Sequence, residues 1–319
     1  MDLTISIVTH RNRELLRECL ASVFADLAGA GVAAEVYVVV NVPGDGSADM
    51  AREKFPQATV LENDRPLGFG ANHNQVIRRA RGRHVFVLND DTTLHPGCIA
   101  ALRDFLDSAP DAGAAGPRVL NLDGTLQQSC YRLPTLGVLF FDAVFLSSLF
   151  PAHPIIGGYK RWPHDTRRAV GHVIGAAVMF SGAALERAGL FDENYFLYYE
   201  EADLCKRLAR AGYGTYLAPE AVVTHHGGAT ISQLGAEGVD YFYTSMHRYY
   251  AKYFGRPALL AVTACNVFGA LGRLALFGAA AAFSPAYRRR SSAKRDSFRQ
   301  VLAWYGGAIF GRSGGKFHL

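Results

Sequence analysis

Two adjacent carboxylates follow a short apolar run near residue 90. Residues Val85 to Leu88 are β-branched or apolar, which predicts a buried strand, and this run ends at Asn89, Asp90 and Asp91. Adjacent carboxylates repel each other unless a positive charge lies nearby. A divalent cation is a natural partner, because hard cations prefer carboxylate oxygens and often carry substrate phosphates. The alternative is a solvated turn that caps a helix beginning near Pro96, since a short motif is only a hypothesis.

A second acidic pair, Glu200 and Glu201, opens a segment with helical spacing. This segment has acids in its first turn and bases in its last turn, as the helix dipole favours. Asp203 and Arg207 are spaced for an i,i+4 ion pair, which explains Asp203 but not the doublet. The doublet follows the aromatic run Tyr195–Tyr199, where two acids are costly unless they have a function. The aromatic run itself is also consistent with core packing.

Strands and helices alternate in the first part of the chain, which predicts an α/β fold with a doubly wound, Rossmann-like sheet. The expected strands are Leu3–Val8, Glu35–Val40, Thr59–Glu62 and Val85–Leu88, and the expected helices are Glu14–Leu27, Met50–Phe55 and Gln75–Ala80. Polar residues follow each strand, and right-handed crossovers bring such strand ends to one edge of a sheet. These residues are Thr9, Arg11, Asp45, Asn74, Asp90 and Asp91. The sequence therefore predicts a polar site along this edge.

The composition is that of a chain with a large core, because 50% of its 319 residues are hydrophobic. The five cysteines are scattered and form no Cys-x-x-Cys pair. We therefore expect buried free thiols in a reducing compartment rather than a disulfide or metal framework. The sequence begins with an alternating strand and without a recognisable signal peptide, so we expect the body in the cytoplasm.

Charge is distributed unevenly along the chain. The net charge is +5, but ten Lys and Arg face one acid, Asp296, from Arg256 onward, so this part carries +9 and the preceding part −4. A basic tail predicts contact with an anionic surface. Nucleic acid is the less favoured partner, because the tail is also strongly apolar. We expect a body over residues 1–254 and a helical tail over residues 255–319.

The tail contains a long apolar run, Ala258 to Phe283, interrupted by Asn266 and Arg273, and a basic run at Arg288–Arg290. One interpretation is a membrane span, since about 20 apolar residues suffice. Another is a set of interfacial helices with a polybasic stretch on anionic lipid. We favour the second interpretation, because Arg273 and several glycines interrupt the run. A soluble helical cap or a homodimer contact is the third interpretation.

Taken together, these motifs resemble those of the family 2 glycosyltransferases, which have the nucleotide-diphospho-sugar transferase (GT-A) fold. The nearest branch is that of the bacterial rhamnosyltransferase-like enzymes of cell-surface polysaccharide synthesis. The resemblance covers roughly Leu3 to Tyr250. The matching segments are Ser6–Thr9, Leu67–Gly70 with Asn74, Leu88–Thr92, Gly116–Leu120 with Asp123–Gly124, Gly175–Ala176, Phe191–Cys205, Gly212–Tyr213 and His225.

The resemblance implies a role for each residue of the predicted donor site. Thr9, Arg11 and Asp45 would hold the base and ribose of a nucleotide-diphosphate sugar. Asn74 would also belong to the donor-binding residues. Asp90 would lie near the ribose and the sugar. The family usually has Asn where this chain has Arg11, which affects the grip on the nucleotide.

By the same resemblance, Asp91 would bind the metal ion that bridges the diphosphate, and His225 would be a second ligand. Without the resemblance, His225 is interpreted as a satisfied histidine at a strand end. Glu201 occupies the place of the catalytic base, which is usually Asp in the family. The expected acceptor side comprises Gly175, Ala176 and Glu200, together with the turn from Phe191 to Tyr199. The chain also departs from the family before the Gly-Ala pair, where His172 stands in place of the Trp that the family often has.

The resemblance thus implies an inverting glycosyltransferase that depends on Mn²⁺ or Mg²⁺. It would move a sugar, with rhamnose favoured by similarity, from a nucleotide-diphosphate donor to a lipid-linked or polysaccharide acceptor in cell-surface glycan synthesis. We expect it at the inner face of the plasma membrane, attached peripherally. The alternative is a non-catalytic sugar-nucleotide-binding subunit, which the presence of Glu at position 201 motivates.

Overall fold

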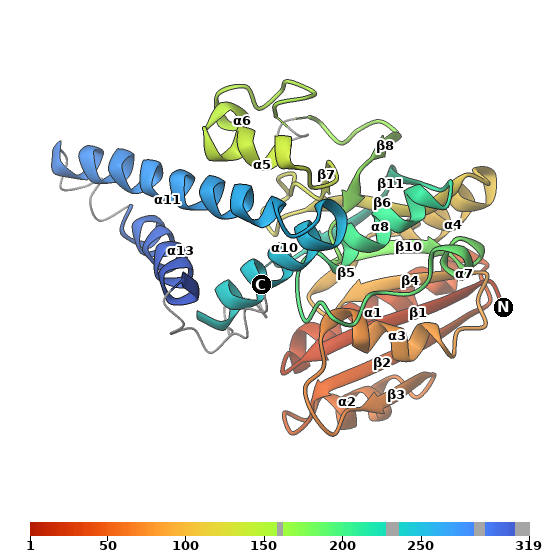
Figure 1. The fold of residues 1–319 in the computed structure, drawn as a ribbon. Coiled ribbons are helices and arrows are strands. Elements are labelled where there is room, and N and C mark those ends of the chain that lie inside the picture. Colours follow the sequence, from red (N-terminus) through yellow and green to blue (C-terminus); the bar gives the residue numbers. More distant parts are fainter. Residues whose placement is uncertain (158–161, 228–235, 284–290, 310–319) are drawn as a thin grey trace. The chain divides into compact units, whose positions relative to one another are not determined.

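The computed structural model describes residues 1–157, 162–227, 236–283 and 291–309 (Figure 1). The chain divides into two compact units. The first comprises Met1–Leu133 and Trp162–Gln233, and the second Pro134–Arg161 and Leu234–Leu319. Residues 134–157 and 236–254 thus belong to the same unit as the described part of the tail. The expected division of the chain into a body and a tail at residues 254/255 therefore stays a prediction.

The first unit is built on a sheet whose strand order is β3-β2-β1-β4-β10-β6-β11-β5, with β8 paired to β11. Strands β1, β2, β3 and β4 run parallel, whereas β10 is antiparallel to both β4 and β6. The strands are β1 (Leu3–His10), β2 (Ala34–Val42), β3 (Ala58–Glu62), β4 (His84–Asn89), β5 (Thr92–Leu94), β6 (Ala112–Leu120), β8 (Arg168–Val170), β10 (Ala177–Ser181) and β11 (Gly214–His225). The predicted mixed α/β sheet is confirmed.

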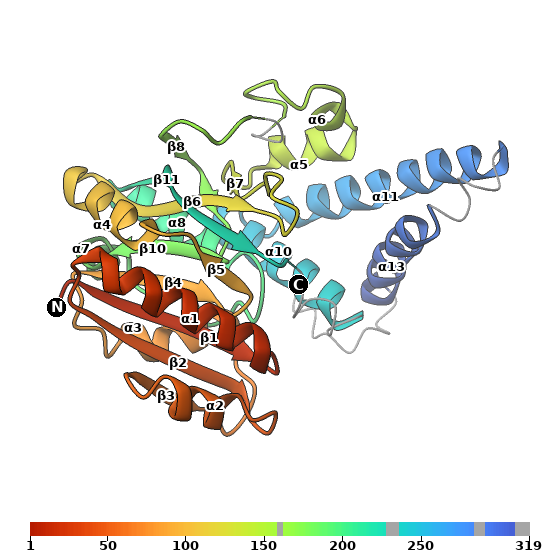
Figure 2. The same cartoon turned by 180° about the vertical axis from the view of Figure 1, so that it is seen from behind.

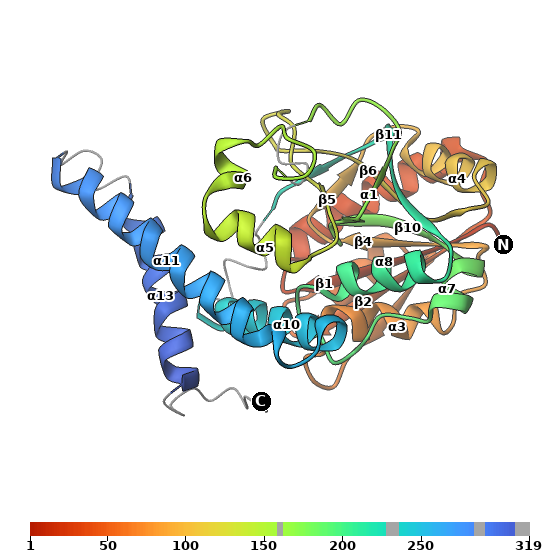
Figure 3. The same ribbon diagram turned by 45° about the horizontal axis from the view of Figure 1, so that its top comes forward.

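Helices cover both faces of this sheet. They are α1 (Arg13–Ala30), α2 (Ser47–Lys54), α3 (Phe69–Ile77), α4 (Cys98–Ser108), α7 (Gly182–Ala188) and α8 (Glu200–Arg210). Side chains of α1, α2 and α4 share one hydrophobic cluster, and side chains of α3, α7 and α8 share the other. Figure 2 shows α1 and α4 in front of the sheet, and Figure 3 shows α3, α7 and α8 on the opposite face.

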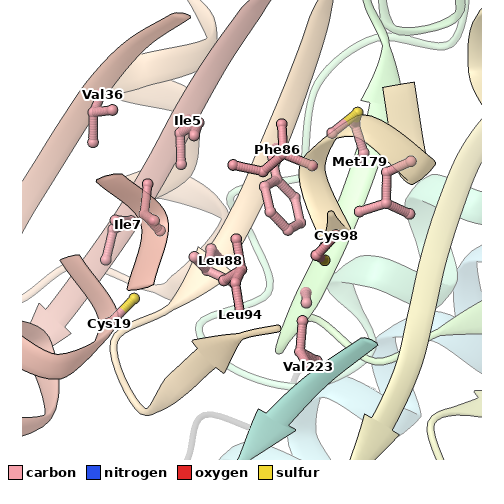
Figure 4. Packing of buried hydrophobic residues seen from close by; sticks show 14 of the residues in the cluster. Ile5, Ile7, Cys19, Val36, Phe86, Leu88, Leu94, Cys98, Met179 and Val223 are labelled. Carbon is pink, nitrogen blue, oxygen red and sulfur yellow. The ribbon is translucent and has the colours of Figure 1, made fainter. Parts of the chain in front are cut away.

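Strand β4 is buried on both faces, as its continuous apolar run predicts. Phe86 and Leu88 point into the cluster under α1 and α4, together with Met179 of β10 (Figure 4). Val85 and Val87 point into the other cluster. This alternation fixes the strand register, because a slip of one residue would exchange the two sets of side chains. The strand therefore holds the acidic residues at its carboxyl end in a fixed position.

Proline interrupts one of the later strands without ending it. The apolar stretches Thr215–Leu217 and Ala221–Thr224, on either side of Pro219, form one strand, β11, which lies between β6 and β5. The pairing register shifts between Ala218 and Val222. Pro219 lies in this shift, and because proline lacks a backbone N–H it is tolerated within a sheet at such a bulge. The apolar stretch from Arg168 to Ser181 contains three short strands, β8, β9 (His172–Val173) and β10, and β9 pairs with β7 (Cys130–Tyr131).

The second unit is helical. It contains α5 (Leu136–Ala143), α6 (Leu146–Leu149), α10 (Ala236–Phe254), α11 (Ala258–Phe283) and α13 (Ser292–Ile309). Polar contacts connect these helices. The His247 ring of α10 contacts the Tyr305 hydroxyl of α13 at 3.1 Å, and Arg273 of α11 donates to the Asp142 carbonyl of α5 at 2.7 Å. The basic run at residues 288–290 lies outside the described residues.

Candidate active site

The acidic pair lies at the carboxyl end of β4, where the sequence placed it. Asp90 is 3% exposed and Asp91 is 5% exposed. Asp90 accepts hydrogen bonds from the His10 backbone and the Asn12 side chain, each at 3.4 Å. Burial raises the Asp90 pKa to about 7, the charge of Asp91 adds to this rise, and the polar groups of Thr9 and Asn12 oppose it. The two carboxyl groups thus share an enclosed site that favours one negative charge rather than two.

His225 lies beside Asp91, because β11 pairs with β5 immediately after the acidic pair. His225 is opposite Thr92 in this ladder, and the His226 backbone donates to the Asp91 carbonyl at 3.0 Å. The distance from His225 Nε2 to Asp91 Oδ1 is 3.2 Å. Asp91 Oδ1 is buried and accepts no hydrogen bond from the residues that the structure describes. A buried carboxylate oxygen and an imidazole nitrogen that face each other form a donor set that suits a divalent cation.

Asp91 and His225 would supply only part of the coordination shell of a metal ion. Among the described residues, no cluster of three or more His, Cys, Asp or Glu side chains could hold a metal ion. Hard cations that assist phosphate chemistry are usually bound by one or two protein ligands together with substrate phosphates and water. Asp91 and His225 therefore fit an ion that arrives with its substrate better than a permanently bound structural ion.

The predicted nucleotide side lies at the ends of β1 and β2. Arg11 is exposed and adopts a left-handed backbone conformation, with φ of 56°, as occurs at binding turns. Thr9 is fully buried next to Asp90. The Asp45 carboxylate accepts hydrogen bonds from the Ser47 hydroxyl at 2.7 Å and the Ser47 backbone at 3.1 Å, at the start of α2. The parallel strands thus bring these residues to the sheet edge that carries the acidic pair.

Asn74 lies within α3, and the protein itself occupies its side-chain amide. Its Nδ2 donates to the Phe191 carbonyl and to Glu193 at 2.9 Å each, and its Oδ1 accepts from the Phe191 backbone at 3.1 Å. Asn74 therefore anchors the start of the turn that leads to α8. A role for Asn74 in donor binding remains a prediction.

The glycines of the Leu67–Gly70 segment also serve this turn. A side chain at Gly68 would place its Cβ 2.6 Å from the Phe196 carbonyl oxygen, and a Cβ at Gly70 would lie 2.7 Å from that of Phe191. The Phe69 backbone donates to the same Phe196 carbonyl at 2.8 Å. The segment thus allows close backbone approach of the turn, which is a use of glycine that sequence alone did not identify.

The second acidic pair opens helix α8. Tyr198 and Tyr199 precede it with φ values of 69° and 68°. Two consecutive left-handed residues with bulky side chains cost conformational energy, and such residues concentrate at functional sites. The strained turn places Glu200 inside the protein, 3% exposed, while Glu201 remains half-buried. The Oε2 atom of each glutamate is buried and has no hydrogen-bond partner in the described part of the chain.

Burial perturbs both glutamates, in a way that suits a proton acceptor. It raises the Glu201 pKa to about 7, and backbone contacts, including that of Gly175, oppose the rise. It raises the pKa of Glu200 further, with the charge of Glu201 as a second cause. Burial and mutual repulsion thus hold the pKa of both carboxyl groups above the ordinary value, that of Glu201 near neutral pH. A carboxylate with a pKa close to the working pH is well matched to general base catalysis.

Gly175 and Ala176 connect the two acidic pairs. The Ala176 carbonyl accepts from the Asn89 backbone at 2.9 Å and from the Thr92 hydroxyl at 3.3 Å, on either side of Asp90 and Asp91. Gly175 contacts Glu201 through its backbone and lies against the ring of Phe69, where a Cβ would be 2.8 Å from Cζ. The carboxyl end of β4 and the start of α8 therefore adjoin the same short segment.

A family model described as "Glycosyltransferase like family 2" matches residues 2–237, which is most of the chain. The chain belongs to this family. Within glycosyltransferase family 2, it is 32% identical over 203 residues to the N-acetylglucosaminyl-diphospho-decaprenol L-rhamnosyltransferase of Mycobacterium tuberculosis. This alignment covers 60% of the present chain and 66% of the relative, just under two thirds of the relative's length. The low-salt glycan biosynthesis hexosyltransferase Agl10 of Haloferax volcanii is 25% identical over 66% of the chain and 62% of that protein.

Solved glycosyltransferases share the fold of this family 2 protein, and the predicted GT-A fold is thereby confirmed. The mannosyltransferase PcManGT from Pyrobaculum calidifontis, solved with GDP-Man and Mn²⁺, matches 98% of the chain and 88% of its own, with a TM-score of 0.55 and 18% identity. GalNAc-T7, solved with UDP, GalNAc and Mn²⁺, matches 70% of the chain and 44% of its own, with a TM-score of 0.53 and 13% identity.

Proposed function

We propose that this family 2 protein transfers a sugar, with inversion at the anomeric carbon, from a nucleotide-diphosphate donor to a hydroxyl of a lipid-linked or polysaccharide acceptor. The observation that carries the proposal is the pair of buried acidic sites that meet at Gly175–Ala176. One site combines Asp91 with His225, and the other presents Glu201 with a pKa near neutrality. The mycobacterial relative bears the name of a rhamnosyltransferase with a diphospho-decaprenol acceptor, which favours rhamnose and a polyprenyl diphosphate sugar here.

In this proposal each acidic site performs one half of the reaction. Glu201 accepts the proton of the acceptor hydroxyl, and the freed oxygen attacks the anomeric carbon from the side opposite the diphosphate. The bond between this carbon and the phosphate oxygen breaks, and its electron pair leaves with the nucleoside diphosphate. Asp91 and His225 would hold Mn²⁺ or Mg²⁺, which supplies Lewis acid stabilisation of the departing diphosphate. Thr9, Arg11 and Asp45 would bind the nucleoside.

The remaining site residues position the substrates. Asp90, with its raised pKa, would share hydrogen bonds with hydroxyl groups of the ribose or sugar. Glu200, together with Gly175 and Ala176, would border the acceptor. Transfer assays with a panel of nucleotide sugars and added Mn²⁺ test the proposal against a non-catalytic sugar-nucleotide-binding subunit. Binding of a donor without transfer or hydrolysis to any acceptor tested would favour the subunit.

The proposed base makes the reaction rate depend on pH. Because Glu201 must be ionised to accept a proton, and burial raises its pKa to about 7, we expect kcat to rise about tenfold for each pH unit below 7 and to level off above it. Glu201→Asp should keep this acidic limb with a shifted midpoint. The measurement is the pH profile of kcat at saturating donor and metal. A flat profile between pH 5 and 8 would contradict the assignment.

The second unit has a surface that fits a membrane. Among the described helices, α11 alone is long and apolar enough to cross a bilayer. Only 22% of its most apolar 18-residue stretch is buried inside the protein. Its exposed side chains are all apolar, the largest being Leu260, Phe268, Leu271, Leu276 and Phe283. On α10 and just after it, Arg248, Lys252 and Arg256 are exposed at intervals of four residues. Apolar and basic groups together suit anionic lipid headgroups above acyl chains.

We therefore place the second unit on the inner face of the plasma membrane, with α11 along the surface rather than across it. Arg273, in the middle of α11, donates to the Gly269 carbonyl of its own helix and to the Asp142 carbonyl of α5, so α11 is bound to α5. This placement would bring the protein to a lipid-linked acceptor. A homodimer through the same apolar side chains is the competing arrangement.

Substitution of the apolar α11 side chains tests this placement. Phe268→Ser combined with Leu271→Ser is expected to weaken binding to phosphatidylglycerol vesicles at least tenfold, since each exposed side chain that enters the bilayer contributes about 1 kcal/mol or more. Leu122→Ser is the matched control, because Leu122 is 65% exposed in the first unit. Co-sedimentation at low salt is the measurement. Equal binding of vesicles by the double variant and the control would refute the membrane contact. A double variant that loses a dimer but still binds vesicles would refute it as well.

A further inference from the structure

Gln127 is hydrogen-bonded to the proposed metal ligand His225 on the side away from Asp91. The distance between Gln127 Oε1 and His225 Nδ1 is 2.6 Å. Gln127 follows the turn at Asp123 and Gly124, and its backbone donates to the Val119 carbonyl of β6 at 2.9 Å. The side chain thus reaches His225 from a segment anchored on the central sheet.

The other contacts of Gln127 decide which end of its amide faces the histidine. Its Nε2 donates to the Asn121 side-chain oxygen at 2.8 Å and to the His225 carbonyl at 3.3 Å. A carbonyl oxygen can only accept, so Nε2 must be the amide atom on that side. Oε1 is consequently the atom that faces the imidazole ring, and it requires a hydrogen on His225 Nδ1.

This orientation determines what His225 presents to Asp91. With the hydrogen on Nδ1, the neutral ring directs the Nε2 lone pair toward Asp91 Oδ1, 3.2 Å away. Neither atom then donates to the other, and no other described residue donates to Asp91 Oδ1. Two acceptors held in contact define a position for a cation. Hydrogen bonds to the far nitrogen of a ligating histidine are known to fix its tautomer and orientation.

Gly227 makes room for this arrangement. It has a φ of 68°, and a Cβ there would lie 3.2 Å from Gln127 Nε2 and 4.0 Å from His225 Nδ1. The backbone after β11 therefore folds closely over the Gln127–His225 pair. We infer that Gln127 is a positioning residue that fixes the His225 tautomer required for binding a divalent cation with Asp91. The inference rests on the proposed metal-dependent function.

Two substitutions separate this role from a structural one. Gln127→Met keeps the shape but removes the acceptor for Nδ1–H, whereas Gln127→Glu keeps an acceptor and loses the Nε2 donor. We expect Gln127→Met to weaken Mn²⁺ affinity 10- to 100-fold, and Gln127→Glu to stay within about threefold of the wild type. Gln75→Met, which removes one hydrogen bond to Asn63, is the control and should leave affinity unchanged.

Mn²⁺ affinity is measured by electron paramagnetic resonance of the full chain, with Mn²⁺ alone and with dTDP, UDP or GDP added. Equal loss in both Gln127 variants would show a structural role, and equal retention would show no role; either result overturns the inference. If the wild type binds no Mn²⁺, the metal-dependent function fails instead. Nitrogen NMR of ¹⁵N-histidine protein without metal gives an independent test, since a hydrogen on Nε2 of His225 would also overturn the inference.

Discussion

Glu201→Gln is expected to lower kcat by a factor of about 10² to 10⁴, the usual contribution of a positioned general base. The amide keeps the shape of the carboxyl group but cannot take the proton from the hydroxyl group of the acceptor substrate. The Michaelis constant for the donor should change little, because Glu201 touches the Gly175 side of the site rather than the residues proposed for the nucleotide. The measurement is steady-state transfer with saturating donor, acceptor and Mn²⁺.

The fold should survive this substitution and gain stability at alkaline pH. Because burial raises the Glu201 pKa in the folded protein, the folded state binds more protons than the unfolded state between the ordinary value and about 7. Stability therefore falls as pH rises through this window. The uncharged amide avoids this loss, so a melting temperature 2–4 °C above the wild type at pH 8, about 1 kcal/mol, is expected. Glu186→Gln, at an exposed position of α7, is the control for both readouts, and full activity in Glu201→Gln would contradict the base.

Asp91→Asn is expected to abolish metal-dependent donor binding and to lower kcat/KM by at least 100-fold. The carboxylate is 5% exposed, its Oδ1 has no hydrogen-bond partner among the described residues, and the His225 ring lies 3.2 Å from it. Its charge has no other evident function at this position, and an amide oxygen is a much weaker ligand for a hard cation. The measurement is thermal stabilisation by nucleoside diphosphate with and without Mn²⁺, since a ligand that binds only the folded state raises its melting temperature.

Asp49→Asn provides the matched control for this experiment, because the Asp49 side chain is 89% exposed. The control should retain the full Mn²⁺-dependent shift, whereas Asp91→Asn should show the same small shift with and without the ion. Unimpaired Mn²⁺-dependent stabilisation in Asp91→Asn would mean that the ion binds elsewhere, and the metal assignment would then be wrong.

The elements that depend on local patterns could be predicted from the sequence. Strand β4 has a continuous apolar run because both its faces are buried, and helix α8 begins at Glu200 and contains the predicted pair of Arg207 and Asp203 at 2.8 Å. The gathering of strand ends at one edge also follows from general rules of parallel sheets. In these cases the pattern that predicts the element lies within a few consecutive residues.

Features that depend on distant partners could not be predicted in this way. Asn74 is typical of a binding loop in sequence, yet its amide bonds to a turn 117 residues away. The bulge at Pro219 hides the continuity of β11, because a proline normally interrupts a strand. Gln127 gave no signal, since only the pairing of β11 with β5 and β6 brings His225 to it. A polar residue shortly after a predicted turn is common in loops.

The central claim is that Asp91 and His225 hold a divalent cation on the diphosphate of the donor. Pulsed electron paramagnetic resonance of Mn²⁺ bound to the protein with the nucleoside diphosphate that stabilises it most tests this directly. The account predicts a ³¹P coupling and an imidazole nitrogen coupling from the same ion, with the nitrogen signal lost in His225→Ala. A bound Mn²⁺ that shows phosphorus but no imidazole coupling in the wild-type protein, or a signal that persists in His225→Ala, would contradict it.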